Sequence, residues 1–168
     1  MGIMFDRLKK LFVSSEQDLT VRQRVRLARE HLDRGKLDEA YAEAQAAVQQ
    51  GPDDASAHRV LGEVLLERRD LERARKALER ARELDGELPD IHYLLGLVYT
   101  QRKELETAVR HYRSELSRNP QHGRVHANLA VALYSLKQPR EALQHADRAK
   151  ALGEELHPDF LEALKRYR

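Results

Sequence analysis

The chain has 168 residues, of which 41% are hydrophobic, 35% are charged and 5% are aromatic. Its 30 lysines and arginines nearly balance its 28 aspartates and glutamates, which argues against nucleic-acid binding, because one sign of charge normally dominates such a surface. It has no cysteine for disulfides or thiolate chemistry and no apolar run of about 18 residues that could span a membrane, so we expect a cytoplasmic protein.

Residues 1–20 are predicted to form an amphipathic helix and a hinge. Six apolar side chains gather on one side of this helix: Ile3, Met4, Phe5, Leu8, Leu11 and Phe12. Because the remaining positions are largely cationic, residues 1–13 can bind a membrane surface, dock on a partner or fold back as a cap on the chain that follows. All three readings stay open. Ser15 and Asp18 are predicted to form a capping box for the next helix.

From residue 21 onward a unit of 34 residues is repeated four times. Two ladders have this period, namely Leu27, Leu61, Leu95 and Leu129, and Ala40, Ala74, Ala108 and Ala142. The units are 21–54, 55–88, 89–122 and 123–156, with no insertion. Each contains two amphipathic segments joined by a short polar turn. The pattern predicts an all-α solenoid of four antiparallel helix pairs.

Small, turn and capping residues mark where these helices end and where they meet. Gly35 is suited to the left-handed turn between the first two helices, Asp54 to the N-cap of the third, and Pro139 to the first turn of the eighth. Gly62 and Gly96 lie inside helices, where glycine costs roughly 1 kcal/mol relative to alanine, so we expect tight helix packing at both.

Glu115 interrupts a ladder of small residues formed by Ala47, Ala81 and Ala149 in the second helices. A carboxylate at a packing position predicts either solvation through a local register shift or a looser helix junction. Residues 157–168 are predicted to form a C-terminal capping helix, with Pro158 at its start. A stack of repeats needs such a cap, because its last hydrophobic face would otherwise meet water.

The repeats carry a recognisable motif, Leu95-Gly96-x-x-Tyr99 followed by Ala108 and Pro120. This pattern resembles the tetratricopeptide repeat, and the resemblance covers residues 21–156. It implies a right-handed superhelix in which the first helix of each repeat lines a concave groove that binds a peptide or helix of a partner protein. The position usually held by tryptophan differs in all four repeats: Arg24, His58, His92 and His126. Glu154 also replaces the closing proline of the fourth repeat.

The phase of the repeats predicts which residues line this groove. Arg22, Arg26 and Arg29 share one helix face, with spacings of four and three, so their guanidiniums can bind carboxylates, and Arg59 adds to them from the next repeat. An apolar floor is expected from Tyr93, Leu94, Leu97, Val131 and Tyr134, and Asn128 is expected to bind the partner's backbone. Such a surface suits an acidic-hydrophobic segment. The lysine and asparagine residues of the family's dicarboxylate clamp are absent.

The sequence contains no motif for a nucleophile, a metal or a bound phosphate. His58, His92 and His126 share one phase of the repeat, and His111 and His145 share another, so we expect them at a recurring helix–helix contact. His122 and His126 are spaced like two metal ligands on a helix, but no third ligand accompanies them. We therefore expect no catalytic residue, no metal site and no cofactor.

The sequence as a whole predicts a non-catalytic adaptor or scaffold that binds another protein in its groove. Two alternatives remain. One is a peripheral membrane scaffold recruited through residues 1–13. The other is a secretion or assembly chaperone that shields a hydrophobic segment of its partner. Self-association, through an unfilled groove or through the N-terminal helix, is compatible with each of them.

Overall fold

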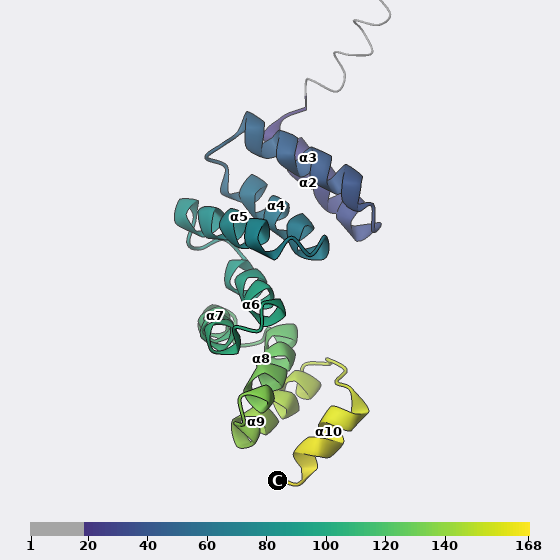
Figure 1. Cartoon of the computed structure of the whole chain (residues 1–168), viewed down its shortest axis with the longest axis vertical. Helices are drawn as coiled ribbons and strands as arrows, with labels where there is room; N and C mark the ends of the chain where they lie inside the picture. Colours follow the sequence, from purple (N-terminus) through teal and green to yellow (C-terminus); the bar gives the residue numbers. More distant parts are fainter. Residues whose placement is uncertain (1–18) are drawn as a thin grey trace, which may run out of the picture.

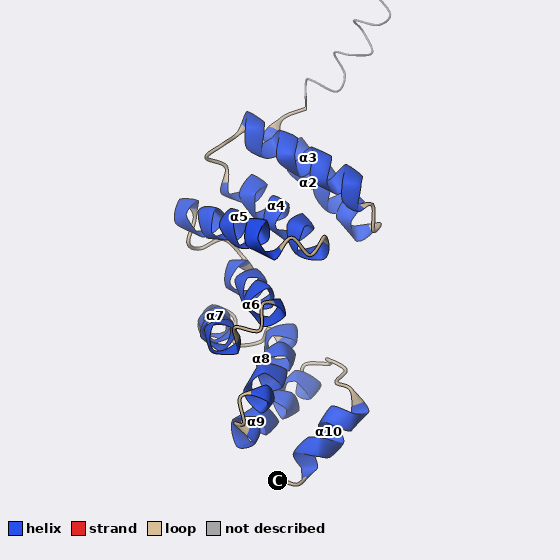
Figure 2. Ribbon diagram, viewed as in Figure 1, coloured by secondary structure: helices blue, strands red, loops and turns tan. Residues whose placement is uncertain are grey.

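The computed structural model describes residues 19–168, which form nine helices and no strand (Figure 2). Residues 1–18, with the predicted amphipathic helix, lie outside the described part. The helices are α2 (Val21–Asp33), α3 (Leu37–Gln50), α4 (Ala55–Glu67), α5 (Leu71–Leu84), α6 (Ile91–Gln101), α7 (Leu105–Arg118), α8 (Gly123–Ser135), α9 (Pro139–Ala151) and α10 (Pro158–Lys165). No helix within residues 19–168 is both long and apolar enough to cross a membrane.

The helices pack as four consecutive pairs, α2 with α3, α4 with α5, α6 with α7 and α8 with α9. Each pair falls within one 34-residue unit of the sequence. Figure 1 shows the pairs following one another along the long axis of the molecule, with α10 at the C-terminal end. The predicted all-α solenoid is confirmed.

Helix α2 begins with a capping box, but with different residues from those predicted. The Oγ1 atom of Thr20 accepts a hydrogen bond from the Gln23 amide at 3.3 Å, and Gln23 Oε1 accepts one from the Thr20 amide at 2.8 Å. The prediction of Ser15 and Asp18 was wrong, because the helix begins later than the capping pattern suggested. Asp54 caps α4 as expected, with its carboxylate 2.8 Å from the Ala57 amide.

The turn between the two helices of every repeat contains one residue in the left-handed conformation. In the first repeat this residue is Gly35, with φ 69°, as expected from its sequence position. In the other three repeats the same phase holds Arg69, Lys103 and Lys137, with φ values of 62°, 63° and 62°. A side chain with a Cβ atom is disfavoured in this conformation by about 1–2 kcal/mol, so three of the four turns are strained.

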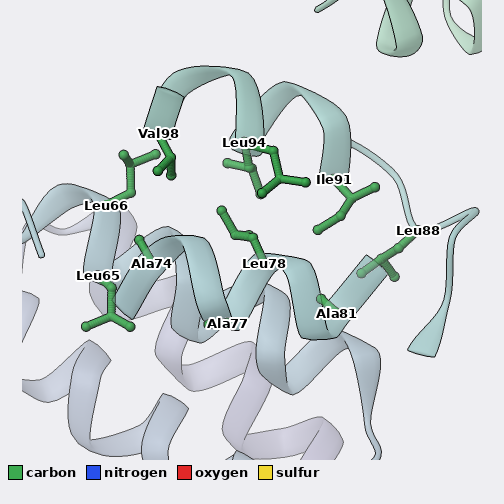
Figure 3. Packing of buried hydrophobic residues seen from close by; sticks show 11 residues of the cluster. Leu65, Leu66, Ala74, Ala77, Leu78, Ala81, Leu88, Ile91, Leu94 and Val98 are labelled. Carbon is green, nitrogen blue, oxygen red and sulfur yellow. The ribbon is translucent and has the colours of Figure 1, made fainter. Parts of the chain in front are cut away.

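The core of the solenoid is built from the repeated small and apolar positions. A Cβ atom on Gly96 would lie 2.4 Å from Cε1 of Tyr112, and one on Gly62 would lie 2.5 Å from Cγ of Leu78. Both glycines thus allow the second helix to approach the first, as predicted. Figure 3 shows the contact between successive repeats, where Leu78 of α5 points toward Leu94 of α6.

Glu115 is not solvated, so that expectation for it was wrong, whereas the alternative of a looser junction stays a prediction, since Glu115 lines a hollow of about 180 Å³ with Asp90. Its side chain is buried, with 5% of the residue exposed, and its Oε2 atom accepts a hydrogen bond from the Tyr93 amide at 3.3 Å. Asp90, which precedes α6, adopts a φ of 61° and makes no side-chain cap. Glu115 therefore supplies, from α7, the carboxylate that the N-terminus of α6 lacks.

The two ends of the described stack differ in character. At the C-terminal end, α10 packs on the last repeat, with Leu164 fully buried and the Phe160 ring in an edge-on contact with Tyr134 at 5.5 Å. In α6, three apolar residues face the preceding repeat: Ile91, Leu94 and Val98. The same positions of α2, at the N-terminal end, hold exposed polar residues: Gln23, Arg26 and Glu30. The first face of the stack is therefore polar.

Candidate binding groove

The first helices of the repeats line the inner side of the solenoid. Helix α2 contacts α4, and α4 contacts α6, although each pair of helices is separated in sequence by the second helix of a repeat. Second helices make no contact of comparable extent with one another within residues 19–168. Elements on the inside of a curved stack lie closer together than those on the outside. These contacts place α2, α4 and α6 on the concave face, and the phase of the repeat assigns α8 to the same face.

The four arginines predicted at the N-terminal end of the groove lie around one hollow of about 860 Å³ between α2 and α4. Its remaining lining residues are Gln23, Val25, Asp54 and Ser56. Arg22 has no hydrogen bond or ion pair within the described part of the chain, and Arg26 has only a 3.7 Å contact with Glu30. Two of the guanidiniums are therefore available to an incoming anion. We call this hollow, with Arg22, Arg26, Arg29 and Arg59, the arginine hollow.

Glu63 holds the other two arginines. It follows Arg59 by one turn of α4, and its Oε1 atom is 3.5 Å from the Arg59 guanidinium. Its Oε2 atom is 3.4 Å from Nη2 of Arg29, which comes from α2. Burial raises the pKa of Glu63, and the opposing effect of Arg29 is smaller. The pairing of Glu63 with two arginines emerges only from the packing of α2 against α4.

The predicted apolar floor is only partly present in the structure. Val131, on α8, is an apolar residue that is 46% exposed to solvent. Leu94 is 6% exposed and belongs to the core, so its assignment to the floor was wrong. Leu97 is half-buried against that core, and Tyr134 packs on α10. The repeat phase gave the correct helices but could not show which side chains a neighbouring helix covers.

Tyr93 and Asn128 have partners within the protein. The Tyr93 ring lies 5.1 Å from that of His122 and 6.4 Å from that of Tyr112, and burial raises the pKa of the Tyr93 hydroxyl. Asn128 donates a hydrogen bond from Nδ2 to the Arg124 carbonyl, one turn earlier in α8, at 2.9 Å. Neither residue lines the arginine hollow. The structure thus brings the four arginines together, but not the aromatic and amide residues with them.

A second set of contacts, which the sequence reasoning did not find as pairs, joins the two helices within three of the four repeats. In the third repeat, Nδ1 of His92 is 3.2 Å from Nδ1 of His111; in the fourth, the corresponding atoms of His126 and His145 are 2.8 Å apart. The first repeat uses an ion pair in the same place, since Arg24 is 2.9 Å from Glu43. The expectation of a recurring helix–helix contact is confirmed. The constant spacing of 19 residues was the signal that could have revealed the pairs.

The hydrogen bonds assign the protons in the fourth-repeat pair. His126 has its Nε2 atom 3.1 Å from the carbonyl of Pro120, so Nε2 carries the proton and Nδ1 accepts. The Nδ1 atom of His145 then donates to His126. Burial lowers the pKa of His145, and the same effect lowers the pKa of His92 and brings that of His111 to about 4. These imidazoles are therefore neutral at physiological pH.

The histidines do not form a metal centre in the described part of the chain. No group of three histidine, aspartate or glutamate side chains there is arranged to hold a metal ion. His122 lies 3.2 Å from Asp90, while His126 is paired with His145, so the two residues with metal-ligand spacing have different partners. The geometry assigns His122 and His126 to packing contacts between helices.

Comparison with known proteins agrees with this architecture. The family model of the tetratricopeptide repeat matches residues 25–89, 66–117 and 93–157. The chain belongs to the tetratricopeptide repeat family. The unusual histidines thus occupy the helix–helix contact at which a tetratricopeptide repeat usually places tryptophan.

Individual known proteins match different shares of the chain. U-box domain-containing protein 70 of Oryza sativa subsp. japonica is 33% identical over 104 residues, and peroxisome biogenesis protein 5 of Arabidopsis thaliana is 30% identical over 128 residues. These matches cover 62% and 75% of the chain, but only 12% and 16% of the two relatives. The crystal structure of MamA superposes with a TM-score of 0.73 at 24% identity, covering 86% of this chain and 83% of MamA, which supports the fold alone.

Proposed function

We propose that this tetratricopeptide repeat protein is a non-catalytic, cytoplasmic adaptor that holds a peptide or helix of a partner protein in its concave groove. The arginine hollow is the observation that carries the proposal. Four guanidiniums from α2 and α4 surround one cavity, and two of them are available to a ligand. Arginine binds carboxylates through paired, charge-assisted hydrogen bonds, so the hollow favours an acidic group.

The rest of the groove supports an apolar portion in the same segment. Val131 projects into solvent from α8, two repeats beyond α4, and the half-buried Leu97 lies on the intervening α6. A partner segment that places acidic residues on α2 and apolar residues on α8 would use both ends. Because Tyr93 and Asn128 have internal contacts, we assign them the supporting role of shaping the surface around Val131.

The test is affinity capture from a lysate of the native cells with the full chain as bait. Arg26→Glu reverses a charge at the mouth of the hollow, and Val131→Asp removes the exposed apolar contact. Tyr134→Ala is unsuitable, because Tyr134 supports Phe160 of α10. Lys150→Glu is the matched control, since Lys150 is exposed on the second helix α9 and its side chain has no hydrogen bond or ion pair in the described structure.

We expect Arg26→Glu and Val131→Asp to lose partners that the wild type and Lys150→Glu both retain. Recovery of the same partners by all four proteins would refute binding in the groove. Recovery of the chain itself as the ligand would assign the groove to self-association. A partner that is soluble only when co-expressed with this chain would favour the chaperone alternative.

One observation favours the membrane scaffold as a second candidate. The N-terminal face of the first repeat presents Gln23, Arg26 and Glu30 to solvent, which gives the apolar residues of segment 1–13 no apolar face to cover there. A cationic segment with an apolar side binds anionic lipid. Co-sedimentation with vesicles of phosphatidylserine and phosphatidylcholine tests this candidate. Equal recovery of the full chain and a variant lacking residues 1–13 would remove it.

A further inference from the structure

Two arginines of the hollow already have a carboxylate partner, Glu63, which is not itself among the residues that line the hollow. Glu63 lies 3.5 Å from Arg59, which is one turn earlier in α4, and 3.4 Å from Arg29, across the junction with α2. Its side chain is 21% exposed, so the carboxylate is largely withdrawn from water at the groove surface. An acidic ligand that reached these two guanidiniums would have to take the place that Glu63 now occupies.

We propose that Glu63 is an internal competitor that lowers the affinity of the arginine hollow for acidic ligands whose carboxylates reach Arg29 and Arg59. The inference rests on the proposed function, because it concerns the same groove. A carboxylate that takes over only Arg29 and Arg59 would gain only what Glu63 already provides. Paired carboxylates gain contacts with Arg22 and Arg26 in addition to those they take from Glu63.

The geometry of the two ion pairs makes displacement feasible. Charge-assisted hydrogen bonds between guanidinium and carboxylate usually measure about 2.7–2.9 Å. Arg75 and Glu79 reach 2.6 Å elsewhere in this chain, whereas both contacts of Glu63 are at least 3.4 Å. Glu63 therefore neutralises Arg29 and Arg59 without holding either in an optimal bidentate arrangement.

The charges around Glu63 couple ligand binding to protonation. Arg29 and Asp33 face it from α2, Arg59 from α4 and Asp90 from the start of α6. Burial already raises the pKa of Glu63, with smaller increases from Asp90 and Asp33. A ligand carboxylate that takes over the arginines adds another negative charge, which further favours the protonated form of Glu63. Protonation of Glu63 before binding would likewise free the arginines.

The probe is a fluorescein-labelled hexaglutamate peptide, titrated with the full chain and followed by fluorescence anisotropy. Glu63→Gln removes the competing charge while keeping the shape of the side chain. Glu67→Gln is the matched control, because Glu67 lies one turn further along α4 and has no ion pair in the described structure. At pH 8 we expect Glu63→Gln to bind about fivefold more tightly than wild type, the upper range for one exposed ion pair, and Glu67→Gln to change little.

The difference in affinity between wild type and Glu63→Gln should be smaller at pH 5 than at pH 8, because the raised pKa of Glu63 favours its neutral form as the pH falls. Titration of the peptide affects both proteins equally and cancels in their ratio. If Glu63→Gln melts below the working temperature, Glu63→Met serves as the second uncharged variant.

Equal or weaker binding by the uncharged variant would overturn the inference, since Glu63 would then have only a structural role. Failure of hexaglutamate to bind either protein would overturn it as well. Neither result decides the proposed function, which is judged by whether Arg26→Glu loses captured partners. A neutral hexaglutamine peptide must fail to bind, and binding equal to that of hexaglutamate would also contradict the inference.

Discussion

In the third and fourth repeats, a histidine pair joins the two helices, and the stability of this contact depends on pH. The pKa of His111 is lowered to about 4 by burial and by the neighbouring His92, against a usual value of 6.5. Because the folded pKa is the lower one, the unfolded chain binds more protons between about pH 4 and 6.5. The contribution of His111 is fully present above pH 6.5 and is lost as the pH falls through this window.

We predict that protonation of His111 lowers the free energy of unfolding by about 1 kcal/mol when the pH falls from 7.5 to 5. This value is smaller than the full linkage effect because the His111 side chain is partly exposed. His111→Ala should abolish most of this loss, and it reproduces the His58–Ala77 combination of the second repeat. Urea denaturation at both pH values measures it. His157→Gln, at an exposed histidine before α10, is the control. An unchanged pH dependence in His111→Ala would show that the pair does not couple to protons.

The turn of each repeat offers a second test at the residue scale. Lys103 adopts a φ of 63°, and its counterpart in the first repeat is glycine with a φ of 69°. Lys103→Gly should therefore raise the free energy of unfolding by about 0.5–1 kcal/mol, or about 2–4 °C in melting temperature.

The reciprocal variant provides the control for that turn. No atom lies within 4 Å of a Cβ built on Gly35, so Gly35→Ala changes only the backbone preference. It should lower stability by about 1 kcal/mol. Differential scanning calorimetry of both variants checks the sign. If the two substitutions shift the melting temperature in the same direction, the turns are not strained in the way their dihedral angles indicate.

At the scale of helices, the two ends of the stack should respond differently to truncation. A chain ending at residue 156 loses the buried Leu164 and the Phe160 contact, and it exposes Tyr134. We expect a loss of roughly 3 kcal/mol, from the burial of two large apolar side chains. Removal of residues 1–13 should change stability by less than about 0.5 kcal/mol, because the first face is already polar.

Urea denaturation of the two truncated chains beside the full chain measures this difference. A loss of more than 1 kcal/mol on removing residues 1–13 would mean that the segment packs on the repeats. The reading of this segment as an intramolecular cap would then gain support over docking on a membrane or a partner.

The helices were largely predictable, whereas their ends were not. The leucine and alanine ladders show which face of each helix is buried, because the residues of that face recur every 34 positions. Thr20 was missed because several serine, threonine and aspartate residues precede α2, and the pattern does not select among them. The burial of Glu115 could not be predicted, because its hydrogen bond to the Tyr93 amide follows a left-handed turn at Asp90. No residue type in the sequence indicates that turn.

At the scale of the whole molecule, the stacking determines which predicted groove residues can meet a ligand. The arginine hollow was predictable because Arg22, Arg26 and Arg29 share one face of a single helix. The apolar floor was not, because the exposure of its members depends on the neighbouring helices. Leu94 is taken into the core, whereas Val131, on the next first helix, is left open.

Site-specific photo-crosslinking tests the central claim, that a partner lies along the concave face, most directly. Benzoylphenylalanine is placed in turn at Arg26, Val131 and Lys150 of the full chain, and the chain is irradiated in the native cells. We expect one partner to crosslink from Arg26 and Val131, on the first helices, and not from Lys150, on the second helix α9. Crosslinking of that partner from Lys150 alone, or equally from all three positions, would contradict the account.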